Sequence, residues 1–172
     1  EAYTANEIKR VAIPSLKRLG LEEFLVENAD GIVAYADAAG KDKINDVLNK
    51  AEELGENPIQ DEVLLCWSAN SENGIYTLYA LKDEDGDGIA PLQGNVVSEA
   101  KAGFKNNHPC VNMAMTRSAE GIWAEMTEKC ASSKRPIAVV LDREVYCAPV
   151  PSERIGGGHS EITGNFTIEE TQ

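Results

Sequence analysis

The acidic run KDEDGDGIAPLQG is the stretch whose residue types and spacing could most directly bind an ion. It matches the first six positions of a calcium-binding EF-hand loop, in which carboxylates at alternate positions point at one ion. The matching residues are Asp83, Asp85, Asp87 and Gly88. The twelfth position of such a loop needs a Glu that gives two oxygens, and Gly94 stands there instead. We therefore favour a plain acidic turn over a calcium site.

Three successive glycines, Gly156 to Gly158, precede His159, and their backbone N–H groups could converge on a phosphate. They lead into a predicted strand and not into a helix N-terminus, so we favour a backbone bend. The sequence lacks GxSxG, HExxH and GxxxxGK[ST], and both histidines, His108 and His159, fall in predicted loops. Asp142 is more simply a turn residue than a catalytic acid. The sequence predicts no catalytic residue, no cofactor and no metal.

The four cysteines are scattered, with no CxxC pair: Cys66, Cys110, Cys130 and Cys147. All except Cys110 fall in a predicted strand or on an apolar helix face, which favours buried free thiols. A zinc site that combines them with His108 or His159 is not expected, because structural zinc normally uses close ligand pairs.

The composition is that of a globular protein with an acidic surface. The 172 residues are 42% hydrophobic and carry a formal charge of −13. Such a surface repels phosphate backbones and anionic lipid headgroups, so nucleic acid is not an expected partner. No stretch approaches the roughly 20 apolar residues that cross a bilayer, and no signal peptide opens the chain. On these grounds alone the chain is expected to be soluble.

The last third of the chain gives the most complete prediction of elements. Val111, Met113 and Met115 alternate with polar or small residues, which predicts a strand with one buried face. A helix capped by Ser118 follows, and Pro136 ends it. Its apolar face comprises Ala119, Ile122, Trp123, Met126 and Cys130. We expect these methionines and Trp123 in the core and not in a binding groove.

A hairpin, a bend and a final strand complete this region. The apolar run Ile137 to Leu141 predicts a strand buried on both faces, and Asp142 to Glu144 a turn into a strand at Val145 to Cys147. The hairpin is expected to pack under the preceding helix. The glycine bend leads to a strand around Ile162, and Thr167 with Glu170 is a capping box for a further helix.

The first half predicts alternating helices and strands. Thr4 and Glu7 form a capping box, and Pro14 gives either one kinked helix or two short ones. We expect a strand at 31–35, a helix ending near Gly55, and a hairpin of 63–68 with 75–81 through Asn73 and Gly74. A short strand and a helical turn are expected over 95–104. The following asparagines, Asn106 and Asn107, are expected at a boundary between lobes.

The segment IAVVLDREVYCAPV followed by GGGHSEITGNFTIEE resembles the first large periplasmic domain of SecD, or of fused SecDF, the accessory subunit of the bacterial Sec translocase. In that family a strand ending in Val-Leu-Asp is followed by a Gly-Gly bend and a Gln-Ile-Thr/Ser-Gly-Asn-Phe-Thr segment. Glu161 replaces the usual Gln and Thr171 the usual Ala. The resemblance is strong over 111–170 and weaker over 63–104. The matching motif residues, to which we assign a structural role, are Gly157, Gly158, Ile162, Gly164, Asn165, Phe166 and Thr167.

The resemblance implies a fold and a domain organisation. We expect an α+β fold of mixed or antiparallel sheets with helices packed on one face, in ferredoxin-like or related two-layer lobes. Residues 1–24 would form a helical segment or linker, 25–104 a first lobe that is the base or connecting portion, and 105–172 a head-like lobe. A periplasmic setting would allow a disulfide, with Cys110 and Cys147 the pair to test.

The resemblance also implies a noncatalytic role in protein transport. The chain would be a soluble fragment, excised from between transmembrane helices, at the periplasmic face of the bacterial inner membrane. Its expected partners are unfolded exported polypeptides and, through the full-length protein, the SecYEG channel, SecF and YajC. Movement of a head lobe relative to a base lobe would help translocation driven by the proton-motive force. The alternative is a secreted calcium-dependent binding module that uses the Asp83 to Gly88 loop.

Overall fold

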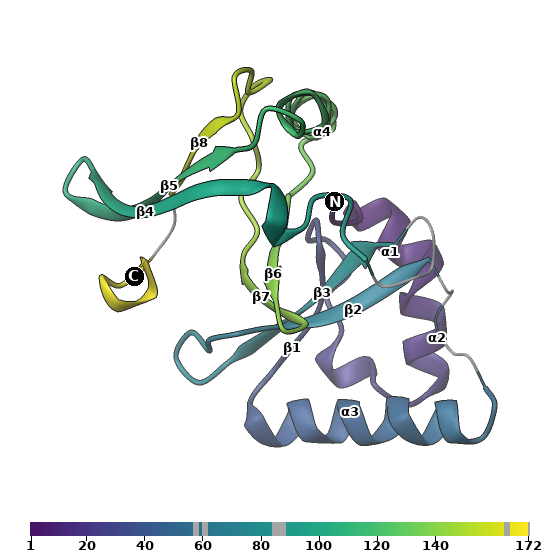
Figure 1. Ribbon diagram of the computed structural model, residues 1–172. Coiled ribbons are helices and arrows are strands. Elements are labelled where there is room, and N and C mark those ends of the chain that lie inside the picture. The colour runs from purple at the N-terminus through teal and green to yellow at the C-terminus, as the bar shows by residue number, and fades with distance from the viewer. Residues whose placement is uncertain (57–58, 60–61, 84–88, 164–165, 172) are drawn as a thin grey trace. The chain divides into compact units, whose positions relative to one another are not determined.

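The computed structural model describes residues 1–56, 59, 62–83, 89–163 and 166–171, and the chain forms two compact units. Unit 1 comprises Glu1–Gly88 with Ala138–Ala148, and unit 2 comprises Ile89–Ile137 with Pro149–Gln172. Each unit combines helices with its own sheet, coloured along the chain in Figure 1. The α+β fold class predicted from the sequence is therefore confirmed.

Unit 1 is built on a five-stranded sheet in the order β1-β3-β2-β7-β6. Neighbouring strands are antiparallel, except that β7 runs parallel to β2. The strands are β1 (Ile32–Ala36), β2 (Val63–Ser68), β3 (Tyr76–Lys82), β6 (Val139–Leu141) and β7 (Glu144–Cys147). The hairpin β2–β3 turns at Asn73 and Gly74, whose φ angles of 52° and 80° suit a tight two-residue turn. This hairpin was predicted correctly.

The helices of unit 1 pack against this sheet through an apolar core. They are α1 (Ala5–Val11), α2 (Ile13–Arg18), the short 3-10 helix η1 (Glu22–Phe24) and α3 (Ala38–Glu53). The predicted capping box is present, because Glu7 accepts from the Thr4 N–H at 2.8 Å and donates its own N–H to the Thr4 hydroxyl. Pro14 lies in the first turn of α2, so the segment forms two short helices. The core side chains include Ile8, Leu16, Val33, Ile44 and Leu78.

Unit 2 is built on a three-stranded antiparallel sheet in the order β4-β5-β8. Its elements are η2 (Gly94–Val96), β4 (Val97–Lys105), β5 (His108–Met115), α4 (Glu120–Ser133), β8 (His159–Thr163) and η3 (Glu169–Thr171). The helical turn expected before Phe104 is wrong, since β4 pairs with β5 along its whole length. Asn106 and Asn107, with φ of 49° and 68°, form the turn between these strands. The expected boundary at 104/105 thus falls at the end of β4, directly before this turn.

The hairpin β6–β7 lies elsewhere than expected. It joins the sheet of unit 1, because β7 pairs with β2, whereas α4 belongs to unit 2. The burial predicted for β6 is also wrong, since Val139, Val140 and Leu141 are 38%, 39% and 58% exposed. An unbroken apolar run does not tell whether a strand lies in the middle of a sheet or at its edge. Strand β6 is an edge strand of its sheet.

Helix α4 is confirmed, with two corrections. Its N-cap is Ala119, which carries no side-chain acceptor, while the Ser118 hydroxyl lies 3.1 Å from that of Thr116. Ile122 is 49% exposed, because the buried face is centred on Trp123 and Thr127 instead. Met115 and Trp123 are buried, with Met113 and Met126 packed against them, so the prediction that they form core is confirmed. In the described residues no helix is long and apolar enough to cross a bilayer.

Candidate functional site

The glycine corner before β8 fixes the geometry of unit 2. Gly157 and Gly158 have φ angles of 77° and 70°, a region that other residues rarely adopt. The Gly158 carbonyl accepts a hydrogen bond from the Met115 N–H at 2.8 Å. A Cβ on Gly158 would lie 2.7 Å from Cγ of Glu120. The predicted bend is confirmed, and it seats the start of β8 against the end of β5 and the start of α4.

Two polar contacts hold α4 to the segment around this corner. The Trp123 indole donates to the Ser160 hydroxyl of β8 at 2.7 Å. The buried Thr127 hydroxyl donates to the Trp123 carbonyl at 2.9 Å and accepts from the Ile155 N–H at 2.9 Å. Sequence analysis missed Thr127 and Ser160. A threonine four residues after a tryptophan, on the buried side of a helix, was the signal available for the first.

Part of the side of the sheet away from α4 is exposed and polar. Ser160 points at α4, so its neighbours His159 and Glu161 point to the opposite side, as successive strand residues do. Paired residues of antiparallel strands share a face, and β8 pairs His159 with Ala114 and Glu161 with Asn112. We call this surface the open face; its members are Glu99, Lys101, Asn112, Ala114, His159 and Glu161.

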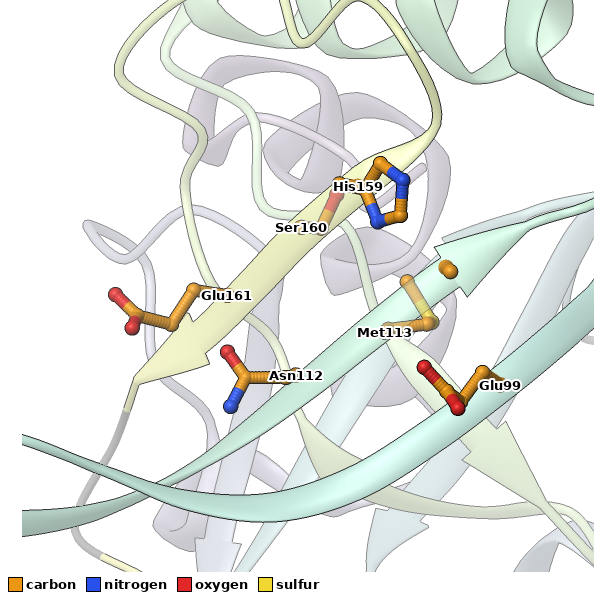
Figure 2. A pocket seen from close by; sticks show the side chains of 7 residues that line it. Glu99, Asn112, Met113, His159, Ser160 and Glu161 are labelled. Atoms are coloured by element: carbon orange, nitrogen blue, oxygen red, sulfur yellow. The ribbon is translucent and has the colours of Figure 1, made fainter.

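A hollow of about 270 Å³ lies on the open face. Figure 2 shows the side chains that line it, which come from β4, β5 and β8. The residues that line it are Glu99, Asn112, Met113, Ala114, His159, Ser160 and Glu161. Sequence analysis identified neither Glu99 nor Asn112 as site residues.

The charges of the open face form pairs. Glu99 pairs with Lys101, and Glu161 pairs with Lys105. The hydrogen bond and the negative charge of Glu161 raise the pKa of Lys105. Gly103 leaves room for the amide of Asn112, because a Cβ there would lie 2.3 Å from Nδ2. The open face therefore offers an amide and an imidazole beside carboxylates that already have cationic neighbours.

This arrangement suits hydrogen bonding better than covalent chemistry. The consecutive residues His159, Ser160 and Glu161 resemble the parts of a catalytic triad, but Ser160 points away from the other two. Within the ranges that the structure covers, no group of three or more His, Cys, Asp or Glu side chains lies close enough to hold a metal ion.

The motif residues lie along the corner and β8. Gly157 and Gly158 form the corner, and Ile162 is buried in β8. Phe166 is half-buried and Thr167 is exposed. Gly164 and Asn165 lie outside the described residues, as do Asp85, Asp87 and Gly88 of the acidic loop.

None of the four cysteines forms a disulfide in the part of the chain that the structure describes. Cys66, Cys110 and Cys130 are buried and Cys147 is half-buried. Burial raises the pKa of Cys66, and it raises the pKa of Cys147 to about 11. Cys110 lies in β5, where its thiol approaches Oε2 of Glu161 at 4.0 Å. Cys110 and Cys147, the pair considered for a disulfide, are unbridged.

Comparison with known proteins gives one family. Residues 80–172, more than half of the chain, match the family model of the SecDF P1 head subdomain. The protein translocase subunit SecD of Rhodothermus marinus is 36% identical over 149 residues, which cover 83% of this chain and 22% of that protein. SecD of Streptomyces coelicolor is 32% identical over 130 residues, covering 72% of this chain and 22% of that protein. The chain thus spans about a fifth of the length of these relatives.

Two solved structures are also similar. A crystal structure of SecDF in its super-membrane-facing form aligns with a TM-score of 0.43 and 19% identity, over 97% of this chain and 25% of that chain. A structure of the membrane component SecDF that enhances protein export aligns with a TM-score of 0.43 and 22% identity, over 91% of this chain and 77% of that chain.

Proposed function

The chain belongs to the SecD/SecDF family, and on that premise we propose that it is part of an accessory subunit of the Sec translocase that contacts exported, unfolded polypeptides. It would lie at the periplasmic face of the bacterial inner membrane. Its association with the SecYEG channel, SecF and YajC would be made through the full-length protein. The role would be binding and movement, without catalysis.

One observation carries the polypeptide contact. Helix α4 covers one side of the three-stranded sheet, and the other side presents the open face with its hollow. An unfolded chain of any sequence offers mainly backbone N–H and C=O groups, which surfaces rich in hydrogen-bonding groups can hold without selecting side chains. The amide of Asn112 and the imidazole of His159 are groups of this kind.

The proposed mechanical role is movement of one lobe relative to another. A head-like lobe would hold the client and swing relative to a base portion, which would hinder backward sliding of the client. The free energy would come from the proton-motive force acting on other parts of the full-length protein. The chain's contribution would then be differential binding of the client in two arrangements.

Binding of unfolded protein tests the contact directly. Fluorescence anisotropy would compare reduced, carboxymethylated α-lactalbumin with its folded, disulfide-intact form as ligands of the 172-residue chain. We expect weak binding of the unfolded form alone. A paired substitution, Asn112→Ala with His159→Ala, should weaken it, whereas Glu153→Ala, at an exposed position of unit 2, should not. Equal binding of folded and unfolded protein would contradict the proposal.

The second candidate is a secreted calcium-dependent binding module. It is supported by the alternate carboxylates of the acidic loop, Asp83, Asp85 and Asp87. Calorimetric titration with calcium would distinguish the two functions. A heat signal at millimolar calcium or below that is lost in Asp85→Ala would favour the calcium module.

A further inference from the structure

Three of the four sheet edges in the described residues carry features that discourage pairing with another chain. The edge strands are β1 and β6 in unit 1 and β4 and β8 in unit 2. The Val26 N–H donates to the Val33 carbonyl of β1 at 2.8 Å, so the chain itself covers part of that edge. Strand β4 carries the charged residues Glu99, Lys101 and Lys105, and β8 carries His159 and Glu161. Charges and local cover are the usual protection of a strand edge.

Strand β6 has no such protection. Its residues are Val139, Val140 and Leu141, which are 38%, 39% and 58% exposed. Tyr146 on the adjoining strand β7 is 47% exposed. In the part of the chain that the structure describes, β7 is the only strand beside β6. An uncharged apolar edge of this kind is a surface on which another strand can form.

The backbone of β6 presents hydrogen-bonding groups outward. Asp142 and Arg143, with φ of 51° and 65°, make the two-residue turn between β6 and β7. In such a hairpin the residues that flank the turn, here Leu141 and Glu144, exchange hydrogen bonds with each other. The N–H and C=O of the next residue, Val140, therefore point away from β7. They are available to a strand that adds at this edge.

We propose that the edge of β6 binds an extended, apolar polypeptide segment of neutral or positive charge by adding it as a further strand of the unit 1 sheet. This inference rests on the proposed function and places a contact with the exported polypeptide in unit 1. Apolar side chains lie on both sides of β6, so the bound segment need not keep one register. That tolerance suits a ligand without a fixed sequence.

Charge selects this occupant over a second copy of the chain. Unit 1 has 21 Asp and Glu against 9 Lys and Arg, a net charge of −12, whereas unit 2 has 8 against 7, a net charge of −1. Pairing two copies of the chain through β6 would bring together two copies of unit 1, each with a net charge of −12. Repulsion between like charges opposes such association. A neutral or basic segment meets no such repulsion.

Peptide binding tests the proposal on the 172-residue chain. The probe is a fluorescein-labelled peptide of alternating valine and lysine, about six residues long, the usual length of a strand. A matched peptide carries N-methyl groups on the amides of one edge, which removes donors but keeps side chains. We expect the N-methylated peptide to bind about fivefold more weakly or worse. A peptide with glutamate in place of lysine should also bind more weakly, with a difference that shrinks in high salt.

Variants of β6 locate the contact. Val140→Pro removes the outward N–H but leaves the hydrogen bonds to β7, and we expect about a fivefold loss of peptide affinity. Val140→Lys places a charge on the edge and should weaken binding at least as much. The control is Val150→Lys, because Val150 is a valine of unit 2 that is 50% exposed. Unchanged Trp67 fluorescence would show that unit 1 remains folded.

Each other outcome overturns the inference. If peptide and unfolded α-lactalbumin bind but Val140→Pro and Val140→Lys match the unsubstituted chain, the contact lies elsewhere and only the proposed function stands. If neither ligand binds, both fail. If sedimentation detects a dimer that Val140→Lys abolishes, the occupant of β6 is a second copy.

Discussion

The two units differ in the kind of surface that they leave accessible. Unit 1 has a net charge of −12 and an apolar sheet edge at β6, and its described residues form three α-helices. Unit 2 is almost neutral at −1, has one α-helix on its sheet, and leaves the open face polar. Net charge is therefore not a guide to which surface is polar. Under the two proposals above, the chain would contact a client through backbone pairing in unit 1 and through side-chain hydrogen bonds in unit 2.

The tryptophans make this comparison measurable. The chain has two, Trp67 in unit 1 and Trp123 in unit 2. A Trp123→Phe background reports on unit 1 alone, and a Trp67→Phe background reports on unit 2 alone. If every substitution below shifted both signals equally, the units would unfold as one body and the comparison would fail.

The largest effect is expected in the core of unit 1. Ile44 of α3 is 1% exposed, so Ile44→Ala removes buried methylene groups and leaves a cavity. We expect the free energy of unfolding of unit 1 to fall by about 3 kcal/mol, measured by urea titration of Trp67 fluorescence. Leu54→Ala, at a residue 71% exposed, is the matched control and should change little. An equal loss from both substitutions would contradict the assigned core.

The next largest effect is expected at the glycine corner of unit 2, where a substitution should destabilise unit 2 and not unit 1. Gly158→Ala places a Cβ at a φ of 70°, 2.7 Å from Cγ of Glu120 and 3.3 Å from Cβ of Met115. We expect unit 2 to lose about 2 kcal/mol of stability, seen in Trp123 fluorescence and not in Trp67. Gly121→Ala meets no atom within 4 Å and lies in α4, so it should stabilise unit 2 slightly. A neutral Gly158→Ala would mean that the corner does not need glycine.

Alkaline pH should weaken unit 1 more than unit 2. Burial raises the pKa of Cys147 from 9.0 to about 11, and it raises those of Cys66 and Tyr79, all three in unit 1. Below pH 9 the thiol is protonated in both folded and unfolded chains. Between pH 9 and 11 the unfolded chain releases the proton more readily, so the folded state loses stability.

Replacing Cys147 isolates its share of this pH dependence. Between pH 9 and pH 11, unit 1 is expected to lose folding stability. We expect Cys147→Ala to reduce this loss of stability by about 1 kcal/mol, allowing for partial exposure of the thiol. Urea titrations of Trp67 fluorescence at the two pH values measure it. Cys130→Ala, at a buried thiol in unit 2, is the control and should leave this loss unchanged.

Local signals in the sequence predicted local structure well. The Thr4 and Glu7 capping box and the Asn73-Gly74 turn each depend on residues that lie within a few positions of one another. Strand β4 was predicted only in part, as a short strand followed by a helical turn, because its segment SEAKAG is rich in residues that are uncommon in strands. Pairing with β5 overrides that preference. Asn106 and Asn107 were read as a boundary because their turn is recognisable only once β4 is known to be a strand.

The candidate site was less predictable because it depends on pairing between distant segments. Glu99, Asn112 and His159 share the open face through the register of three strands, and no short-range pattern contains that register. The predicted location of β6–β7 was wrong for the same reason, since the β2 residues that pair with β7 lie 77 positions earlier in the chain. The glycine corner, in contrast, was predictable, because three successive glycines constrain the backbone by themselves.

The smallest effect is expected on the open face. The Lys105–Glu161 pair is largely exposed to solvent, with 54% and 33% of the two side chains accessible, so Glu161→Gln should change the stability of unit 2 very little. It should lower the pKa of Lys105 toward its ordinary value of 10.5, because Glu161 supplies the two largest causes of its elevation. Titration of the lysine side chains by NMR measures this shift, and Glu153→Gln is the control. A large loss of stability from Glu161→Gln would make the open face a structural element of unit 2, and its charges could then no longer be treated as a surface available to a client.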